Sequence, residues 1–238
     1  MNLRLIFYTI IFSCLVSNSL FGQENETKVN HTLKAGVEIP LQYALQYDLR
    51  FDNKFSINVQ VGILTKPFND AILTTLETFG TDESTIELIE NAFQFGTIID
   101  LGGNYHFGKN YVGLFTQWIG LKAGDTPYQL IESYFGIEFP SPPIPLPPIL
   151  TPKVYLKSDL FQLGFLYGRR FTFKNSPRIE IHTEIALSKN IYSNSSLSSD
   201  HLEVNSINDL VDSELSSIYS KYAYIPTLNI YFVYRLNR

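Results

Sequence analysis

The sequence contains few of the residues that build covalent or metal-bound frameworks. It has one cysteine, Cys14, and four histidines, His31, His106, His182 and His201, that show no metal-ligand spacing. Cys14 lies in an apolar segment near the start. If that segment is removed, the chain has no disulfide, no thiol nucleophile and no thiolate metal site. We therefore expect no metal and no cofactor, and a fold that depends on packing and hydrogen bonds.

Two other features are missing, namely a run of basic residues and a long apolar run beyond residue 22. The 18 Lys and Arg residues are outnumbered by 23 Asp and Glu residues and form no cluster that would follow a phosphate backbone. Nucleic acid is therefore not an expected partner. No later stretch approaches the roughly 20 apolar residues that a membrane-spanning helix needs.

The first 22 residues have the pattern of a secretory signal peptide. Arg4 precedes an apolar run over residues 5–16, and small and polar residues lead to a cleavage site expected after Gly22. A membrane anchor would need a longer apolar run. A lipoprotein site at Cys14 is the other alternative, although Phe12 stands where small residues are usual. The expected organisation is a signal peptide at 1–22 and one domain at 23–238, with a net charge of −6.

Apolar and polar residues alternate with a period of two, which predicts strands with one apolar and one polar face. The clearest pair covers residues 42–51 and 55–65, joined by a turn at 52–54. Its apolar face contains Tyr43, Leu45, Tyr47, Leu49, Phe51, Phe55, Ile57, Val59, Val61 and Ile63.

The same design recurs along the chain and gives eight expected strands. The other six lie at 30–38, 97–107, 111–122, 158–171, 178–189 and 221–236. Both faces of 111–122 are largely apolar, so its orientation stays open.

The connections between these strands alternate between short and long. Three residues at 52–54, three at 108–110 and about six at 172–177 contrast with about thirty each at 66–95, 125–157 and 193–220. The exception is the short connection near Pro40. Short turns at one rim and long loops at the other are typical of outer-membrane barrels.

The polar faces are charged, and aromatic residues gather beside the short turns. Charges of both signs fit a narrow lumen in which they pair, and would not be tolerated against hydrocarbon. The expected lumen charge network contains Lys34, Glu38, Asp48, Arg50, Asp100, His106, Arg170, Glu180, His182, Glu184 and Arg235. An aromatic girdle at the membrane interface is expected from Phe51, Phe55, Phe107, Tyr111, Phe171, Phe173, Tyr231, Phe232 and Tyr234.

With its export signal, its repeated strands and the closing strand at 228–236, the chain resembles the small, porin-like outer-membrane β-barrel proteins of Gram-negative bacteria. The resemblance implies an all-β, eight-stranded antiparallel up-and-down transmembrane barrel with short periplasmic turns and long, partly helical extracellular loops. It also implies outer-membrane lipids and the barrel-insertion machinery as partners. Such proteins usually end in an aromatic residue, whereas Leu236, Asn237 and Arg238 follow Tyr234 here.

The long loops have patterns of their own. Apolar spacing predicts short helices at 70–80, 84–93 and 206–220, which cap the barrel mouth or simply bury their own apolar residues. The proline-rich stretch 140–148 favours an extended, stiff spacer or a recognition segment.

Three functional readings follow. The first is a barrel without catalysis and with a structural, adhesive or narrow-pore role, because eight strands enclose little free space. The second is a membrane-embedded enzyme acting on lipid, with His182 and Glu184, or His106 and Asp100, as candidates. The third is a periplasmic barrel with an apolar interior that binds a ligand.

Overall fold

The computed structural model describes residues 29–51, 54–78, 86, 95–122, 126–127, 153–199, 208–222 and 224–236. The expected signal peptide, the proline-rich stretch and all but residue 86 of the helix expected at 84–93 lie outside this part. No helix within the described part is both long and apolar enough to cross a membrane.

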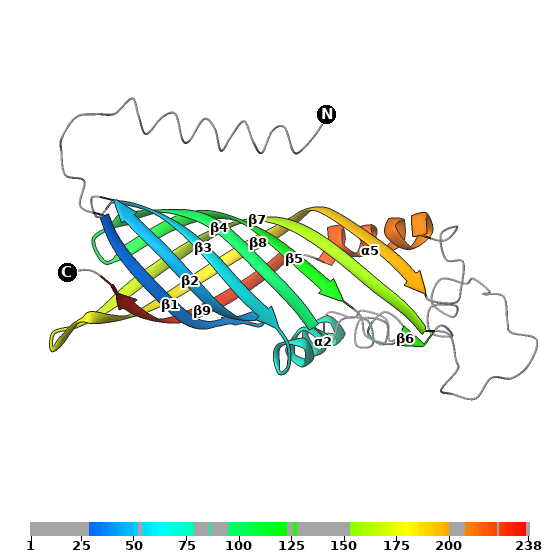
Figure 1. Ribbon diagram of the computed structural model, residues 1–238, viewed down its shortest axis with the longest axis horizontal. Helices are drawn as coiled ribbons and strands as arrows, with labels where there is room; N and C mark the ends of the chain where they lie inside the picture. Colours follow the sequence, from blue (N-terminus) through cyan, green and yellow to red (C-terminus); the bar gives the residue numbers. More distant parts are fainter. Residues whose placement is uncertain are drawn as a thin grey trace, which may run out of the picture.

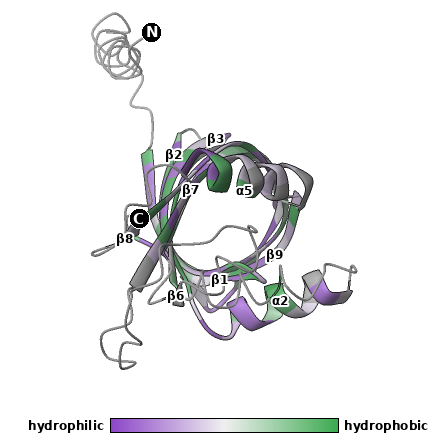
Figure 2. Ribbon diagram, turned by 90° about the vertical axis from the view of Figure 1, so that its right-hand side faces the viewer, coloured by the Kyte–Doolittle hydropathy of each residue, from purple (hydrophilic) through white to green (hydrophobic). Residues whose placement is uncertain are grey.

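Eight strands form a closed antiparallel ring (Figures 1 and 2). Strand β1 pairs with β2 and β9, and β5 pairs with β4 and β7, so the sheet has no open edge around the ring. The strands are β1 (Val29–Ile39), β2 (Gln42–Phe51), β3 (Phe55–Leu64), β4 (Phe95–Phe107), β5 (Asn110–Lys122), β7 (Lys153–Phe173), β8 (Ser176–Ser199) and β9 (Tyr224–Arg235). The expected eight-stranded up-and-down barrel is confirmed.

Apolar side chains face outward and polar side chains face the lumen. In β3, Ser56, Asn58 and Gln60 are buried, while the apolar residues between them are about half exposed. The alternative of a barrel with an apolar interior is therefore wrong. A structure that spans the hydrocarbon core of a bilayer must pair its backbone N–H and C=O groups and present apolar side chains to the lipid. A closed ring with all strands paired and an apolar exterior meets both requirements.

The two ends of the barrel differ. The short turns β2–β3, β4–β5 and β7–β8 lie at the end that also holds the start of β1 and the end of β9, here called the short-turn end (Figure 1). Gly108 takes a φ of 61° in one of these turns, a conformation that glycine adopts without strain. At the other end, the long-loop end, β1 and β2 are joined by Pro40 and Leu41 alone, so the first strand was placed correctly.

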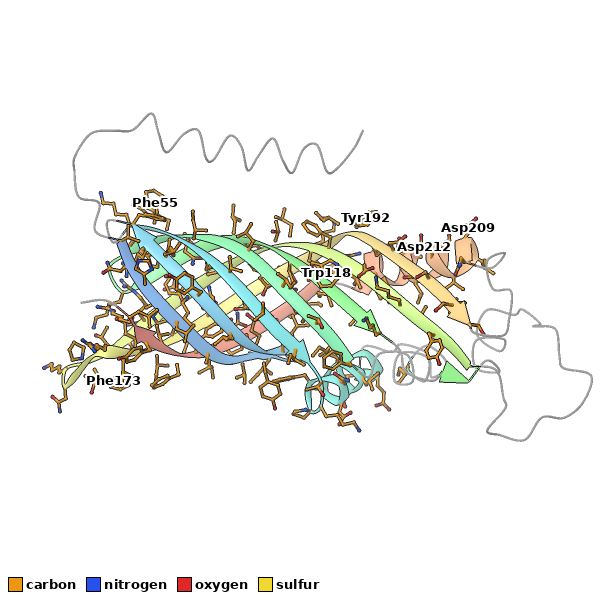
Figure 3. The ribbon with its side chains drawn as sticks, viewed as in Figure 1. Phe55, Trp118, Phe173, Tyr192, Asp209 and Asp212 are labelled. Carbon is orange, nitrogen blue, oxygen red and sulfur yellow. The ribbon has the colours of Figure 1, made fainter. Side chains whose placement is uncertain are left out.

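The aromatic residues expected beside the short turns divide between the two faces. Phe55, Phe107, Phe171, Phe173, Phe232 and Tyr234 are exposed on the outside. Phe55 and Phe173 lie at the short-turn end, with Tyr192 farther along the barrel (Figure 3). Tyr111 and Tyr231 are buried instead, so their assignment to the girdle is wrong.

Strands β7 and β8 are much longer than expected, with 21 and 24 residues. The pairing of β5 with β7 ends at Lys157, and the pairing of β8 with β9 ends at Lys189, so each of the two strands extends past its other neighbour in the ring. We call residues 193–199 of β8, with their partners at 154–160 on β7, the β7–β8 arm. Residues 193–199 were expected in a loop because serine and asparagine on both faces leave no alternation.

Helix α5 (Asn208–Tyr222) and the two-residue strand β6 (Thr126–Pro127) cover the arm. Asn208 accepts the backbone N–H of Leu197 at 2.7 Å, and Asp212 accepts that of Ser195 at 2.6 Å. These are backbone donors on the edge of β8 that β9 leaves uncovered. Strand β6 pairs with the opposite edge, on β7.

Apolar and polar contacts hold α5 in place. Val211 and Leu215 are buried, and the Tyr219 hydroxyl donates to Ser158 Oγ at 3.0 Å. Burial raises the pKa of Tyr219 above its ordinary value, so its hydroxyl stays a donor. The helix expected at 206–220 is confirmed, although it also takes Lys221 and Tyr222 from the expected last strand.

The first long loop begins with α2 (Phe68–Thr78), two residues earlier than the helix expected at 70–80. Phe68 is buried, and its ring centroid lies 4.8 Å from that of Tyr43 on β2. The contact fixes the start of α2 against the long-loop end of the barrel.

Candidate functional site: a filled polar lumen

The expected lumen residues all lie on the inward face of the ring. Arg50, Arg170 and Arg235 are partly exposed near the short-turn end. The others are at most 7% exposed, namely Lys34, Glu38, Asp48, Asp100, His106, Glu180, His182 and Glu184. The structure divides these residues between three levels of the lumen.

Basic residues and Glu180 dominate the level nearest the short turns. Glu180 accepts from Arg235 Nη2 and lies 2.8 Å from His182 Nε2. Arg170 Nη2 donates to the carbonyl oxygen of Gly108. This level therefore ties the rim of the barrel together with charge-assisted bonds.

The middle level centres on Tyr111. Its hydroxyl donates to Glu184 at 2.5 Å and lies 3.3 Å from His182 Nδ1. Lys34 Nζ lies 3.7 Å from Glu184 and stands over the rings of Tyr111 and Tyr231, 5.6 and 5.8 Å from their centroids. The cation is thus held by one carboxylate and two aromatic faces.

Tyr111 fits because a glycine faces it. A Cβ at Gly168, on the neighbouring strand β7, would lie 2.3 Å from Tyr111 Cζ. A glycine within a strand often marks such a close approach. A large ring therefore occupies space that the neighbouring strand leaves empty.

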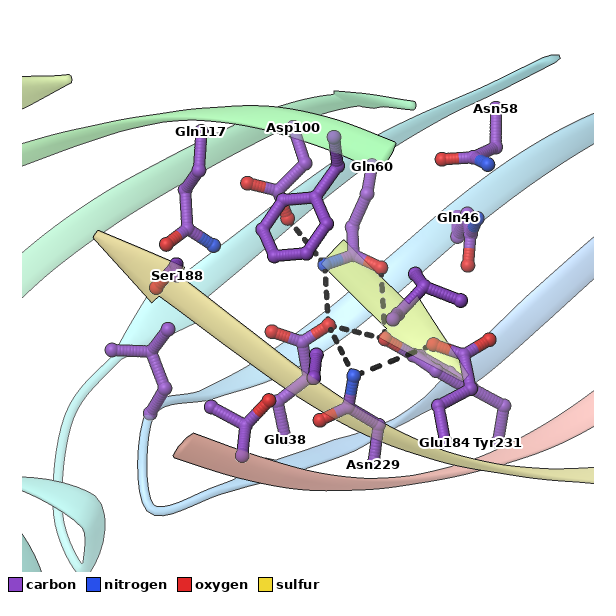
Figure 4. A pocket seen from close by; sticks show the side chains of 15 residues that line it. Glu38, Gln46, Asn58, Gln60, Asp100, Gln117, Glu184, Ser188, Asn229 and Tyr231 are labelled. Carbon is purple, nitrogen blue, oxygen red and sulfur yellow. Dashed lines mark hydrogen bonds between the residues drawn. The ribbon is translucent and has the colours of Figure 1, made fainter. Parts of the chain in front are cut away.

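Two polar rows line the wall of the lumen at the upper level, and Figure 4 shows their members apart from Gln42 and Gln162. Each row takes one residue from each of four neighbouring strands, and its members lie directly opposite one another in the strand register. Row one is Gln60, Asp100, Gln117 and Gln162, on β3, β4, β5 and β7. Row two is Glu184, Asn229, Glu38 and Gln42, on β8, β9, β1 and β2. Together the rows contain one residue from every strand of the ring.

Amide groups join the two rows through their carboxylates. Gln60 Nε2 donates to Glu38 at 2.8 Å and to Asp100 at 2.5 Å. Gln42 Nε2 lies 2.5 Å from Glu38 and 3.4 Å from Asp100. The Tyr231 hydroxyl also donates to Glu38, and Asn229 Nδ2 lies 3.4 Å from both Glu38 and Glu184. Glu38 is therefore the acceptor on which four donors converge.

The space left at this level is a cavity of about 30 Å³, enough for about two water molecules. Both rows contribute to its lining, together with apolar residues such as Phe115 and Leu166. Side chains, rather than solvent, fill the described lumen at this level.

The glutamines and asparagine of the rows were not among the expected site residues, which were charged or histidine. The available signal was the recurrence of amides at inward positions of neighbouring strands. The register of the strands decides which of these amide side chains become neighbours, and the register cannot be read from the sequence alone.

The histidine pairs proposed as catalytic form no direct hydrogen bond within the described part of the chain, although the Tyr111 hydroxyl lies between His182 and Glu184. His182 is bonded to Glu180 and Tyr111. His106 Nε2 lies 2.9 Å from Ser56 Oγ, and its buried Nδ1 has no hydrogen-bond partner among the described residues, so no carboxylate orients this ring. The described residues also bring together no group of three or more His, Cys, Asp or Glu side chains that could hold a metal ion.

No protein-family model matches the chain, and no curated protein matches it. Among solved structures, it is similar to a major outer membrane protein from Thermus thermophilus, with a TM-score of 0.44 and 11% identity over 87% of this chain and 99% of that one. It is also similar to Acinetobacter baumannii CarO2, with a TM-score of 0.37 and 9% identity over 89% of this chain and 100% of that one. At these TM-scores neither likeness assigns a ligand or an activity.

Proposed function

We propose that this chain, whose ring has the architecture of a small outer-membrane barrel, is a closed structural or adhesive scaffold that displays the β7–β8 arm outside the cell. The contrast between a lumen filled with bonded side chains and two strands that extend past their ring neighbours supports this proposal. A barrel that only spans the bilayer has no use for an arm whose two edges are covered by β6 and α5.

The proposal includes the location and the partners of the chain. The apolar exterior needs a bilayer, and the leader at residues 1–22 would direct export to the outer membrane. Outer-membrane lipids and the barrel-insertion machinery are the proposed partners. The excess of acidic residues argues against nucleic acid.

The proposal also excludes catalysis. An enzyme acting on membrane lipid needs its reactive group where the lipid can reach it, yet His182 and His106 are buried inside the ring. His182 is further held between Glu180 and Tyr111. Both histidines therefore act as members of hydrogen-bond networks in this proposal.

A narrow pore is the second candidate, favoured by the polar lining that runs along the lumen. In planar bilayers we expect no resolved conductance steps from the wild-type barrel, because the two polar rows block passage. The double variant Gln60→Ala, Gln117→Ala removes two side chains of row one and is expected to conduct. Reproducible steps from the wild type would replace the scaffold proposal with the narrow pore.

The display of the arm can be tested with single cysteines. In intact cells, Ser198→Cys on the arm should react with a bulky maleimide that cannot cross the outer membrane. Lys174→Cys, exposed in the β7–β8 turn at the opposite end, should react only after the outer membrane is permeabilised. The reverse pattern would mean that the arm faces the periplasm and would refute the proposal.

A further inference from the structure

Four exposed basic residues gather on neighbouring strands at the short-turn end. They are Lys109 in the β4–β5 turn, Arg169 on β7, Lys174 in the β7–β8 turn and Arg178 on β8, here called the basic patch. Strand pairing brings them together, because the backbone N–H of Arg170 donates to the carbonyl oxygen of Lys109 at 2.8 Å and β7 pairs with β8 up to the turn. The patch therefore covers one side of the barrel rim, from the start of β5 to the start of β8.

No exposed acidic side chain accompanies this patch in the part of the chain that the structure describes. At the same end, Asp48 and Glu180 are buried in the lumen, and Asp52 lies outside the described residues. None of the four basic residues forms a salt bridge with a described residue, whereas at the long-loop end Lys66 lies 3.9 Å from Asp70. A surface with charge of one sign attracts partners of the opposite sign, so the patch favours an anionic partner.

Aromatic side chains hold two of the cations on the outside of the barrel. Arg169 Cζ lies 5.6 Å from the centroid of the Phe171 ring, and Arg178 Nη1 donates to the Tyr234 hydroxyl at 3.5 Å. Both aromatic residues are exposed and belong to the expected girdle. A register shift near the end of β7 lets Arg178 reach Tyr234, although strict alternation from the inward Glu180 would turn it into the lumen.

The patch begins where the apolar band of the exterior ends. On the outer face of β7, Phe165 and Tyr167 are exposed and directly precede Arg169. Phe173, beside Lys174, marks the far end of the same hairpin at the short-turn end (Figure 3). The headgroup layer of a bilayer starts where its hydrocarbon core stops, so the anionic groups nearest to the patch are lipid phosphates.

We propose that the basic patch binds the phosphate groups of anionic phospholipids of the phosphatidylglycerol class, in the leaflet around the short turns. Guanidinium groups present paired N–H donors that match phosphate oxygens, and lysine adds point charge. The acyl chains of the same lipids continue along the apolar exterior of β5, β7 and β8, so one lipid contacts both surfaces. That this leaflet faces the periplasm rests on the proposed function, whereas the binding itself does not.

The test uses the full barrel in a non-ionic detergent with equal amounts of phosphatidylglycerol and phosphatidylcholine, and native mass spectrometry counts the lipids that stay bound. Phosphatidylcholine has the same phosphate with a compensating cation, so a difference in retention measures the effect of net charge. The wild type should retain phosphatidylglycerol about fivefold more often, which is the enrichment expected from one cation at an anionic surface. Changing all four patch residues to glutamine should abolish this preference.

The matched control removes the same charge from the long-loop end through Lys66→Gln, Lys122→Gln, Lys157→Gln and Lys189→Gln, which are all exposed positions. This control should keep the preference, and the change in gel migration on heating checks the fold of both variants. If the wild type retains the two lipids equally, or if the control loses the preference as fully as the patch variant, the proposal is wrong. Neither result changes where the arm is displayed, which the cysteine labelling decides separately.

Discussion

Replacing Lys34 with methionine should lower the free energy of unfolding by about 3–5 kcal/mol, because it leaves a buried carboxylate without its cation. Lys34 is 2% exposed, and Glu184, its partner at 3.7 Å, is 4% exposed. Methionine keeps most of the side-chain length and its contacts with the rings of Tyr111 and Tyr231. The decrease in the free energy of unfolding therefore measures the effect of removing the positive charge rather than the loss of packing. Equilibrium unfolding in urea, with the barrel in lipid vesicles, measures it.

A double-mutant cycle and an exposed pair control this prediction. Glu184→Gln in the Lys34→Met background should recover part of the loss, since it removes the stranded charge. Lys157 lies 2.7 Å from Asp159 but is 51% exposed, so Lys157→Met should cost about 0–1 kcal/mol. Equal costs for the two lysines would mean that water reaches Lys34 and that the lumen is not filled as described.

Placing an arginine on the outer face should impair insertion in proportion to depth. Val59 is exposed in the middle of β3, and Val59→Arg should cost about 2–4 kcal/mol, because the charge meets hydrocarbon at the bilayer midplane. The amount of barrel that migrates as the folded form on an unheated gel should fall accordingly. Urea titration gives the free energy.

Phe55→Arg is the matched control on the same strand and the same face. Phe55 lies at the short-turn end (Figure 3), where the cost of a charge falls to about 0–1 kcal/mol. A similar small cost at both positions would contradict a membrane-facing exterior. A larger cost for Phe55→Arg than for Val59→Arg would place the bilayer midplane nearer the short turns.

Alternation in the sequence was sufficient to predict the ring and the direction in which most side chains point. In β3 the pattern repeats without interruption from Phe55 to Ile63, and each apolar residue that was predicted on one face lies outside. This worked because a strand that separates lipid from a polar interior must keep its period of two. The short turns were equally visible from their length.

Where both faces carry similar residues, the pattern fails. Strand β5 has apolar residues on both faces, because Phe115, Ile119 and Leu121 turn inward among the large lumen side chains. Tyr111 was assigned to the outer girdle from its place beside a turn, although its hydroxyl binds Glu184 inside. An aromatic residue with a polar tip suits either environment, so position along the strand could not decide.

The two polar rows show what the pairing of strands reveals beyond the alternation of residues in the sequence. Gln60, Asp100 and Gln117 lie 40 and 17 positions apart in the sequence, yet they are direct neighbours across three strands. Each was expected to point inward only if its own strand was oriented correctly. Their meeting depends on the stagger of the whole sheet, which no single strand encodes.

The seam between β1 and β9 has a consequence for how the barrel assembles. Tyr231 on β9 and Glu38 on β1, which bond across this seam, are separated by 193 positions, whereas the hairpins join strands that are close in sequence. Contacts between distant positions form slowly, because the chain loses loop entropy before any bond rewards it. We therefore expect the hairpins to form early and the seam to close last, in the rate-limiting step of folding. Until then Glu38 lacks the donors of β9, and their arrival gives the final closure a thermodynamic drive.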